Sequence, residues 1–345
     1  MKKSSCKKLL YSLIISFVII LSVGSVIIYK KLYSPLFDID KTVYIYIDEK
    51  KDYHNLLLQL QTTAHIKNLR AFKQLAASLN YPSNMHTGRY AAKPETTLKE
   101  FLSILSNGIQ TPVKLTFNNI RLKEDFARRI SEELMFREDS LLNRLNDPDY
   151  CAQFGLDTNT VLCLFIPNTY EIYWNTGVDK FIRRMKREYD RFWTPERLSL
   201  AESIPITPIQ ASILASIVEE ETAAAPEYPI VSGLYINRLK RGMPLQADPT
   251  VKYAVGDFTL RRILNVHVKT DSPYNTYLHK GLPPGPIRLP SVRGIDAVLN
   301  YSRHNYLYMC AKADFSGRHE FATNINAHNR NAYQYWVALN ARKIY

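Results

Sequence analysis

The feature that most constrains this chain is an uncharged, mostly apolar run near its amino terminus, LLYSLIISFVIILSVGSVIIY at residues 9–29. At about 1.5 Å per helical residue, its 21 residues can cross the roughly 30 Å hydrocarbon core of a membrane. A cleaved signal peptide has a shorter apolar stretch and a small-residue cleavage site, whereas KKLY follows here at 30–33. The run therefore predicts one retained transmembrane helix; the alternative is a buried core helix.

Lysines flank the apolar run, four before residue 9 and two after residue 29. Because lysines are retained on the cytoplasmic side of a membrane, this bias predicts an amino terminus inside and the large remainder outside. We expect a single-pass protein of the cytoplasmic (inner) membrane. The six lysines supply almost half of the formal net charge of +13, so the basic balance is weak evidence for nucleic-acid binding, and no nucleic-acid partner is predicted.

Three of the four cysteines, Cys151, Cys163 and Cys310, follow the apolar run. No pair has a metal-binding spacing such as C-x2-C, and an odd number leaves at least one thiol unpaired within the chain. Unpaired cysteines are commonly small buried hydrophobes. We therefore predict neither a metal site nor a thiol nucleophile.

Beyond the apolar run, the hydrophobic pattern changes near residue 140. Short strand and helix patterns alternate before it, which indicates a small α/β subdomain. Longer helices follow it, and beyond Gly242 the chain is richer in Pro and Gly, as expected of loops around a site. The predicted fold class is α+β, with a cytoplasmic tail and transmembrane anchor at 1–31, a small subdomain at 32–140 and a mixed α+β domain at 141–345.

The individual elements follow from period-2 and period-3.6 patterns and from two capping boxes, at Thr97 and Thr207. The expected strands cover residues 42–47, 113–117, 164–170 and 306–311. The expected helices cover residues 52–62, 66–79, 97–107, 122–135, 178–193, 194–202, 208–224, 227–241 and 326–342.

The helix that starts at Pro208 is nearly apolar all round and ends in three successive acids. Its start is a capping box, Thr207–Gln210, with proline at the first helical position. A helix that is apolar on every side is buried, and a buried carboxylate is costly unless it has partners or a chemical task. Desolvation raises the pKa of such a group, as a general acid near neutral pH requires.

Glu219, Glu220 and Glu221 lie on different faces of that helix. Glu219 joins the arc of small residues, where a bulky ligand has room to approach. Glu221 lies about 200° away, near the apolar arc, and is suited to hold a neighbouring loop or helix. Glu219 is therefore the predicted functional acid. The alternative is that all three acids form a solvated helix end.

Several motifs occur in order in this part of the chain: IVEEET at 217–222, INRL at 236–239, GMPLQADPT at 242–250, SPYNTY at 272–277 and GLPPGPI at 281–287. Over about residues 42–342 the chain resembles the MltG-type (YceG-like) endolytic murein transglycosylases. Gly88-Arg89-Tyr90 is similar to the family's G-x-Y turn. FIPNTY at 165–170 is similar to its F-P-D-T-Y segment, with Ile166 inserted and Asn168 in place of aspartate.

The resemblance implies an inner-membrane enzyme with a LysM-like subdomain and a catalytic domain that cuts glycan strands internally, without metal or cofactor. Its essential glutamate, taken as the first acid of the family's E-x-E-T pair, falls on Glu219. This acid protonates the oxygen between N-acetylmuramic acid and N-acetylglucosamine, and the C6 hydroxyl of the muramic residue closes on C1 to give a 1,6-anhydro end. A hydrolase would ordinarily need a second carboxylate.

Polar residues in the same motifs are the predicted substrate-binding or supporting groups. Asp248 is the candidate second carboxylate, and its alternative role is an Asp-Pro turn. The other polar groups either bind sugar hydroxyl and acetamido groups or hold loops together. His319 and His328 are interpreted as structural hydrogen-bonding groups rather than metal ligands. The supporting set is Glu221, Asn237, Gln246, Asp248, Thr250, Tyr274, Asn275 and Tyr277.

The predicted partners are peptidoglycan glycan strands, the membrane and proteins of cell-wall synthesis. Three functions stay open. The first is a lytic transglycosylase that cleaves new strands near the membrane and thereby ends their elongation. The second is a muramidase that uses Asp248, and the third is a membrane-anchored wall-binding scaffold without catalysis. The subdomain at 32–140 either grips glycan or positions the catalytic domain, and positioning is favoured.

Overall fold

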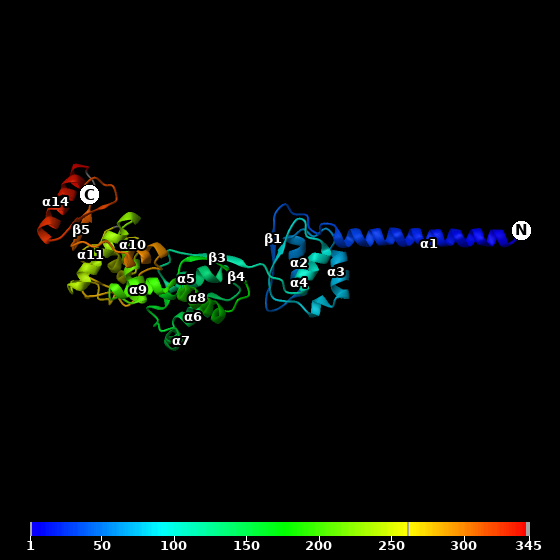
Figure 1. The fold of residues 1–345 in the computed structure, drawn as a ribbon, viewed down its shortest axis with the longest axis horizontal. Coiled ribbons are helices and arrows are strands. Elements are labelled where there is room, and N and C mark those ends of the chain that lie inside the picture. Colours follow the sequence, from blue (N-terminus) through cyan, green and yellow to red (C-terminus); the bar gives the residue numbers. More distant parts are fainter. Residues whose placement is uncertain (1, 261, 343–345) are drawn as a thin grey trace. The chain divides into compact units, whose positions relative to one another are not determined.

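The structure is a computed structural model that describes residues 2–260 and 262–342, and its fold is mixed α+β (Figure 1). The chain forms two compact units. The first comprises Met1–Lys114 with Glu171–Thr176, and the second comprises Leu115–Tyr170 with Gly177–Tyr345. The border passes through two strands that pair with each other, β3 (Val113–Phe117) and β4 (Asn168–Ile172).

Helix α1 (Lys2–Tyr33) contains the apolar run. Its stretch Tyr11–Tyr33 is long and apolar enough to cross a membrane, and large side chains such as Phe17 and Ile20 are exposed. Such side chains are unfavourable in water and suit a lipid environment. The expectation of one apolar helix near the amino terminus is confirmed, and this helix is compatible with a membrane anchor.

The remaining elements of the first unit alternate as the sequence predicts, and the expected strand at 42–47 and helices at 52–62, 66–79 and 97–107 are confirmed. Thr97 caps its helix by accepting a hydrogen bond from the backbone N–H of Glu100, at 3.2 Å. The elements are β1 (Val43–Ile47), α2 (Tyr53–Thr62), α3 (Leu69–Ser78), a 3-10 turn η1 (Tyr81–Ser83), β2 (Gly88–Ala92) and α4 (Leu98–Ser106).

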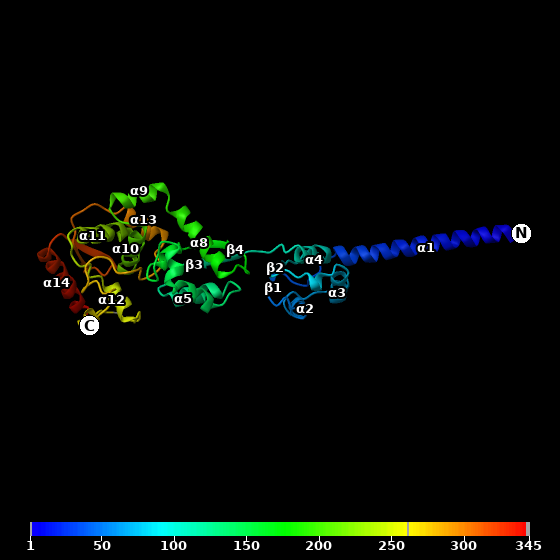
Figure 2. The ribbon, with the colours of Figure 1, turned by 90° about the horizontal axis from the view of Figure 1, so that it is seen from below.

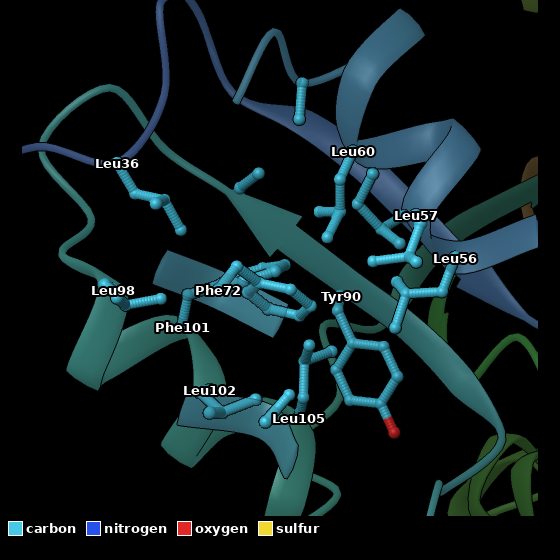
Figure 3. Close-up of a cluster of buried hydrophobic side chains, with 14 of the residues drawn as sticks. Leu36, Leu56, Leu57, Leu60, Phe72, Tyr90, Leu98, Phe101, Leu102 and Leu105 are labelled. Carbon is cyan, nitrogen blue, oxygen red and sulfur yellow. The ribbon is translucent and has the colours of Figure 1, made fainter. Parts of the chain in front are cut away.

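The core of this unit lies between the antiparallel β1–β2 pair and the helices (Figure 3). Strand periodicity turns alternate β1 side chains inward, so that Ile45 lies opposite Tyr90 and both are fully buried. Leucines of α2 and α4 surround Phe72 and Phe101 in Figure 3. Phe101 also meets Phe37 edge to face at 4.9 Å, the geometry that aromatic quadrupoles favour.

Gly88 begins β2 at a point where no side chain fits. A Cβ there would overlap the side chain of Gln110, and the φ of +153° belongs to the region that glycine favours. Two residues later the buried Tyr90 donates a hydrogen bond from its hydroxyl to the carbonyl of His86, at 2.9 Å. The G-x-Y turn is therefore a structural element that ties the strand to the preceding loop.

The second unit is mainly helical, and its core is built around α10, α11 and α13, which pack against one another. Figures 1 and 2 both show α10 beside α11. Its helices are α5 (Lys123–Ser131), α6 (Glu138–Leu145), α7 (Pro148–Ala152), α8 (Val178–Phe192), α9 (Pro195–Ser203), α10 (Pro208–Glu221), α11 (Tyr228–Lys240), α12 (Asp248–Val255), α13 (Val292–Leu299) and α14 (Ile325–Ala341). Short 3-10 turns are η2 (Val161–Leu164), η3 (Ala225–Glu227) and η4 (His267–Lys269), and β5 (Tyr308–Ala311) pairs antiparallel with β6 (His319–Ala322).

Three expected elements of the second unit differ in extent by three or more residues, and each difference has a local cause. The helix expected at 208–224 ends at Glu221, because Thr222 is extended and its hydroxyl accepts a hydrogen bond from the backbone N–H of Ala224 at 3.0 Å. The helix expected at 122–135 ends at Ser131, whose hydroxyl donates to the carbonyl of Arg128 at 2.9 Å and so competes with helix hydrogen bonding. The strand expected at 164–170 begins only at Asn168, because Pro167 has no N–H to donate to a strand partner. The residues before it form η2 instead.

Candidate active site

Helix α10 presents the three acids from the interior of the second unit. Thr207 and Gln210 form the expected capping box, and the helix runs from Pro208 to Glu221. Nine of its consecutive side chains, Ala211–Glu219, are buried, so its position is fixed by packing against α11 and α13. The acids of the last turn are therefore held by a rigid element, as a reactive group requires.

Glu219 is bound to the start of α13. Its two carboxylate oxygens accept hydrogen bonds from the backbone N–H of Ser291, at 3.0 and 3.2 Å, and Oε1 also accepts from the Ser291 hydroxyl. Nε of Arg288 lies 3.7 Å from Oε2. Since Ser291 is the N-cap of α13, the carboxylate also faces the positive end of that helix dipole. Glu219 is thus a buried acid whose partners are all structural.

Gly294, in the first turn of α13, makes this contact possible. A Cβ at Gly294 would lie 2.5 Å from Oε1 of Glu219 and 2.7 Å from its Cδ. The carboxylate therefore rests directly on the helix backbone, in space that any other residue would fill.

Glu220 is held by two arginines. Arg121 donates to both carboxylate oxygens at 2.8 Å, and Arg288 donates to Oε1 at 2.8 Å. Hydrogen bonds between an arginine and a carboxylate are charge-assisted and are among the stronger polar contacts in proteins. Because Arg121 lies in the loop after β3, this pair connects that loop to the end of α10.

Glu221 has a different environment. It is half-buried and accepts one hydrogen bond, from the hydroxyl of Tyr235 on α11, at 3.1 Å. Burial raises the pKa of Glu221 to about 7, and the charge of Asp248 adds to this effect, while the Tyr235 hydrogen bond, Arg238 and Lys252 oppose it. A carboxyl group with a pKa near 7 can both donate and accept a proton at neutral pH.

The second unit contains an open cleft of about 1040 Å³. Glu220 and Glu221 line it from α10, Asp248 and Lys252 line it from α12, and Trp336 lines it from α14. A second cavity of about 240 Å³ is also lined by Glu221. Among the described residues, Glu219 lines neither space. Of the two candidate acids Glu219 and Glu221, Glu221 is therefore the one that borders the cleft.

Asp248 and Tyr277 form a polar pair near Glu221. Asp248 is exposed and accepts a hydrogen bond from the Tyr277 hydroxyl at 2.6 Å, and burial raises the pKa of Tyr277. Gln246 lines the smaller cavity with a left-handed φ of 50°, and its Oε1 accepts from Arg238 at 3.2 Å. Unusual backbone angles of this kind are found at ligand sites.

The remaining predicted residues hold loops together. The side-chain N–H groups of Asn237 donate to the carbonyls of His304 and Tyr306. The fully buried Asn275 donates to two carbonyls of the 268–270 turn, at 2.9 Å each. Thr250 is also fully buried. Its hydroxyl forms a hydrogen bond with the Thr276 hydroxyl at 2.8 Å. Tyr274 packs against Tyr253, with 4.7 Å between the ring centroids.

His319 is a hydrogen-bonding group, as the sequence interpretation has it. Its Nδ1 lies 2.9 Å from Oε2 of Glu227, and its backbone N–H donates to Oε1 at 2.9 Å. Burial by itself would raise the pKa of Glu227, but the hydrogen bonds from His319 and Thr222 hold it below its ordinary value. Thr222 directly follows Glu221, so this cluster also fixes the end of α10.

Within residues 2–260 and 262–342, no group of three His, Cys, Asp or Glu side chains is arranged to hold a metal ion. Cys151 and Cys163 are free and buried, and Cys310 is free and half-buried. Burial raises the pKa of the Cys163 thiol, which keeps it in the unreactive protonated form.

Several residues of this site carry no sequence signal of their own. Ser291, Arg288 and Arg121 meet α10 from segments distant in the sequence. Tyr235 lies in the apolar helix α11, where its sequence gives no sign of a functional role. Its separation of 14 residues from Glu221 is short enough for two consecutive helices to bring the residues together.

Comparison with known proteins places these observations in a family. Residues 45–334 match the YceG-like family. The chain belongs to that family. An endolytic murein transglycosylase of Bacillus subtilis (strain 168) is 26% identical over 340 residues, which cover 93% of each chain. One of Streptococcus pneumoniae (strain D39) is 26% identical over 354 residues, covering 91% of this chain and 63% of that protein.

The chain thus spans about 63% of the length of its streptococcal relatives. A crystal structure of a YceG-like protein from Listeria monocytogenes has the same fold, with a TM-score of 0.54 at 23% identity. The match covers 84% of this chain and 99% of that one. The resemblance to the YceG-like family is confirmed, whereas the roles of the individual site residues stay predictions.

We predict that Gly294→Ala lowers the stability of the protein by about 1–3 kcal/mol, the usual result of overpacking. The added methyl group collides with Glu219, and this cost exceeds the roughly 1 kcal/mol that alanine gains over glycine in a helix. Thermal unfolding of the full chain in detergent, followed by circular dichroism, measures the change. In a Glu219→Ala background the same substitution should become neutral or stabilising. A cost that is unchanged in that background would contradict the contact.

Proposed function

We propose that this protein is an endolytic lytic transglycosylase that cleaves the bond between N-acetylmuramic acid and N-acetylglucosamine in peptidoglycan strands. The family and the names of its relatives support the reaction class. The observation that carries the proposal is one half-buried acid, with a pKa of about 7, at the end of a rigid helix and facing a large cleft. A general acid needs this combination of access and raised pKa.

In this mechanism Glu221 donates its proton to the glycosidic oxygen, and positive charge develops at C1 of the muramic residue. The carboxylate then takes the proton of that sugar's C6 hydroxyl as the hydroxyl oxygen bonds to C1. The product is a 1,6-anhydro end, and Glu221 is again protonated. Because the nucleophile belongs to the same sugar, its effective concentration is high, and one acid serves both steps.

This proposal assigns the acid to Glu221 rather than to Glu219, which the helix pattern favours. Glu219 receives three hydrogen bonds from one serine and faces a helix start. Those contacts surround its carboxylate, and Glu219 is not among the residues that line the cleft. Glu221 has one hydrogen bond, from Tyr235, and an open side toward the cleft. We therefore propose that Glu219 supports the fold beneath the site.

The cellular arrangement is also a proposal. Helix α1 anchors the protein in the cytoplasmic membrane with the amino terminus inside and both units outside, where nascent glycan lies. Cleavage near the membrane would end strand elongation. The proposed division is an anchor at 1–31, a LysM-like subdomain at 32–140 and a catalytic domain at 141–345. The compact second unit begins at Leu115, which supports an earlier end of the subdomain.

The first test compares two matched variants, Glu221→Gln and Glu219→Gln. We expect Glu221→Gln to lose at least about a hundredfold in glycan cleavage, the usual scale of general acid–base catalysis, because a carboxamide neither donates nor accepts the proton. Glu219→Gln keeps substantial activity and loses stability instead. Release of muropeptides from purified sacculi, measured by mass spectrometry with folded protein in detergent, gives both rates. The opposite pattern would assign the acid to Glu219.

The pH profile is the control for this assignment. Because the raised pKa of Glu221 is about 7, its protonated fraction falls as the pH increases through 7, and cleavage should fall with it. A rate that is constant from pH 6 to 9 would contradict the assignment.

The second test addresses the alternative of a muramidase that uses Asp248. If the C6 hydroxyl is the nucleophile, Asp248→Asn lowers activity only in part, because it weakens the contact with Tyr277 and removes a charge that helps raise the pKa of Glu221. The products still end in 1,6-anhydro sugar. A hydrolase would give reducing ends, heavier by one water, and would lose nearly all turnover in this variant. Mass spectrometry of the products separates the two, and the absence of any product would indicate a scaffold.

The third test addresses orientation. We expect protease added to spheroplasts to degrade the two compact units of the intact protein while leaving a fragment that contains α1. Digestion only after the membrane is lysed would show the opposite orientation. A cytoplasmic protein with a known location serves as the control for membrane integrity.

A further inference from the structure

The helix α14 carries an exposed aromatic face. Trp336 and Tyr333 are 56% and 64% exposed, and their rings stack at 5.9 Å with an interplanar angle of 27°. None of the helix's own residues is fully buried. Large aromatic side chains left in solvent are unfavourable, and when they cluster they commonly mark a binding surface.

One side of this aromatic face belongs to the cleft. Four residues of α14 line the cleft that Glu221 and Asp248 also line: Tyr335, Trp336, Leu339 and Asn340. Their spacing of one, three and four residues places them along one face of the helix. Helix α14 also packs against the β5–β6 hairpin. In this contact the His328 ring stacks on the Tyr308 ring, with 5.5 Å between their centroids. Tyr335 packs on Phe315 at 5.7 Å, whereas the exposed Trp336 is accessible to a ligand in the cleft.

We propose that Trp336 forms a sugar-stacking subsite of the cleft, at which the apolar face of a pyranose ring of the glycan strand rests on the indole. This inference rests on the proposed function, because it takes the glycan strand as the ligand of the cleft. A pyranose ring presents C–H groups on its faces and hydroxyl groups around its rim. The exposed indole of Trp336 can pack against the C–H groups, and the polar residues of the cleft can form hydrogen bonds with the hydroxyl groups.

The charges in the cleft agree with a carbohydrate occupant. The same space is lined by acids, by Lys252 and Arg262, and by the aromatic and apolar side chains of α14. This mixture of one aromatic wall and polar groups of both signs is suited to a hydroxyl-rich chain that carries charged substituents. The volume of about 1040 Å³ lies at the upper end of ordinary ligand sites, as an extended chain requires.

The test uses the full chain in detergent with Glu221→Gln, so that glycan binds without turnover. Binding of purified, uncrosslinked glycan strands is measured by calorimetry for Trp336→Ala, Trp336→Phe and Val337→Ala. We expect Trp336→Ala to weaken binding roughly tenfold, about 1.4 kcal/mol, and Trp336→Phe to restore most of it. Val337, the exposed neighbour on the same helix, is the matched control, and its variant should bind within about twofold of the parent.

A kinetic measurement separates this inference from the proposed function. In the chain with native Glu221, Trp336→Ala should raise KM roughly tenfold while kcat and the 1,6-anhydro ends are retained. Normal binding and KM in that variant, with cleavage intact, would overturn the subsite alone. A native chain that neither binds nor cleaves glycan would overturn both. Trp336-dependent binding to phospholipid vesicles without glycan affinity would assign the aromatic face to the membrane and overturn the subsite.

Discussion

Three consecutive carboxylates end a helix that is buried along most of its length, and each of them needs a separate partner. Successive residues of a helix point in directions about 100° apart, so one neighbouring segment cannot serve all three. Ser291 binds the first, Arg121 and Arg288 bind the second, and Tyr235 binds the third. The end of α10 thereby connects α13, the loop after β3 and α11.

This arrangement divides the acids by chemical role. Two of them are surrounded by donors, and unpaired burial of either charge would be strongly unfavourable. The third has only one neutral donor and an incomplete shell, so its proton is held more tightly and a ligand can approach. In the proposed function, the first two acids position the helix end that carries Glu221, the proposed general acid.

Much of this fold follows from the sequence. The Thr207–Gln210 capping box sets the start of α10, and the apolar pattern shows that α10 is buried. The helical arcs also separate Glu219 from Glu221. The hydrophobic pattern does not show which part of the protein, or which ligand, packs against each face of the helix. Small residues admit either a ligand or another helix, and here Gly294 of α13 occupies the space beside Glu219.

Short helices between loops could not be predicted from the sequence for a related reason. Helices α12 and α13 have eight residues each, too few to show a helical period, and both begin in Pro-containing segments that read as loops. Their starts are fixed instead by contacts with distant residues, such as that between Ser291 and Glu219. The polar motif residues Asn237 and Asn275 donate hydrogen bonds to loop carbonyls, whereas their predicted role toward a substrate stays a prediction.

The attachment of α14 has a consequence for how a polymer enters the cleft. One wall is a helix with no fully buried residue, packed on a two-stranded hairpin, and such peripheral elements open at low free-energy cost compared with the core. A strand in the cell wall often offers no free end to thread through a closed tunnel. In the proposed function, a wall that opened in this way would admit a glycan strand laterally, at any point along its length, as endolytic cleavage requires.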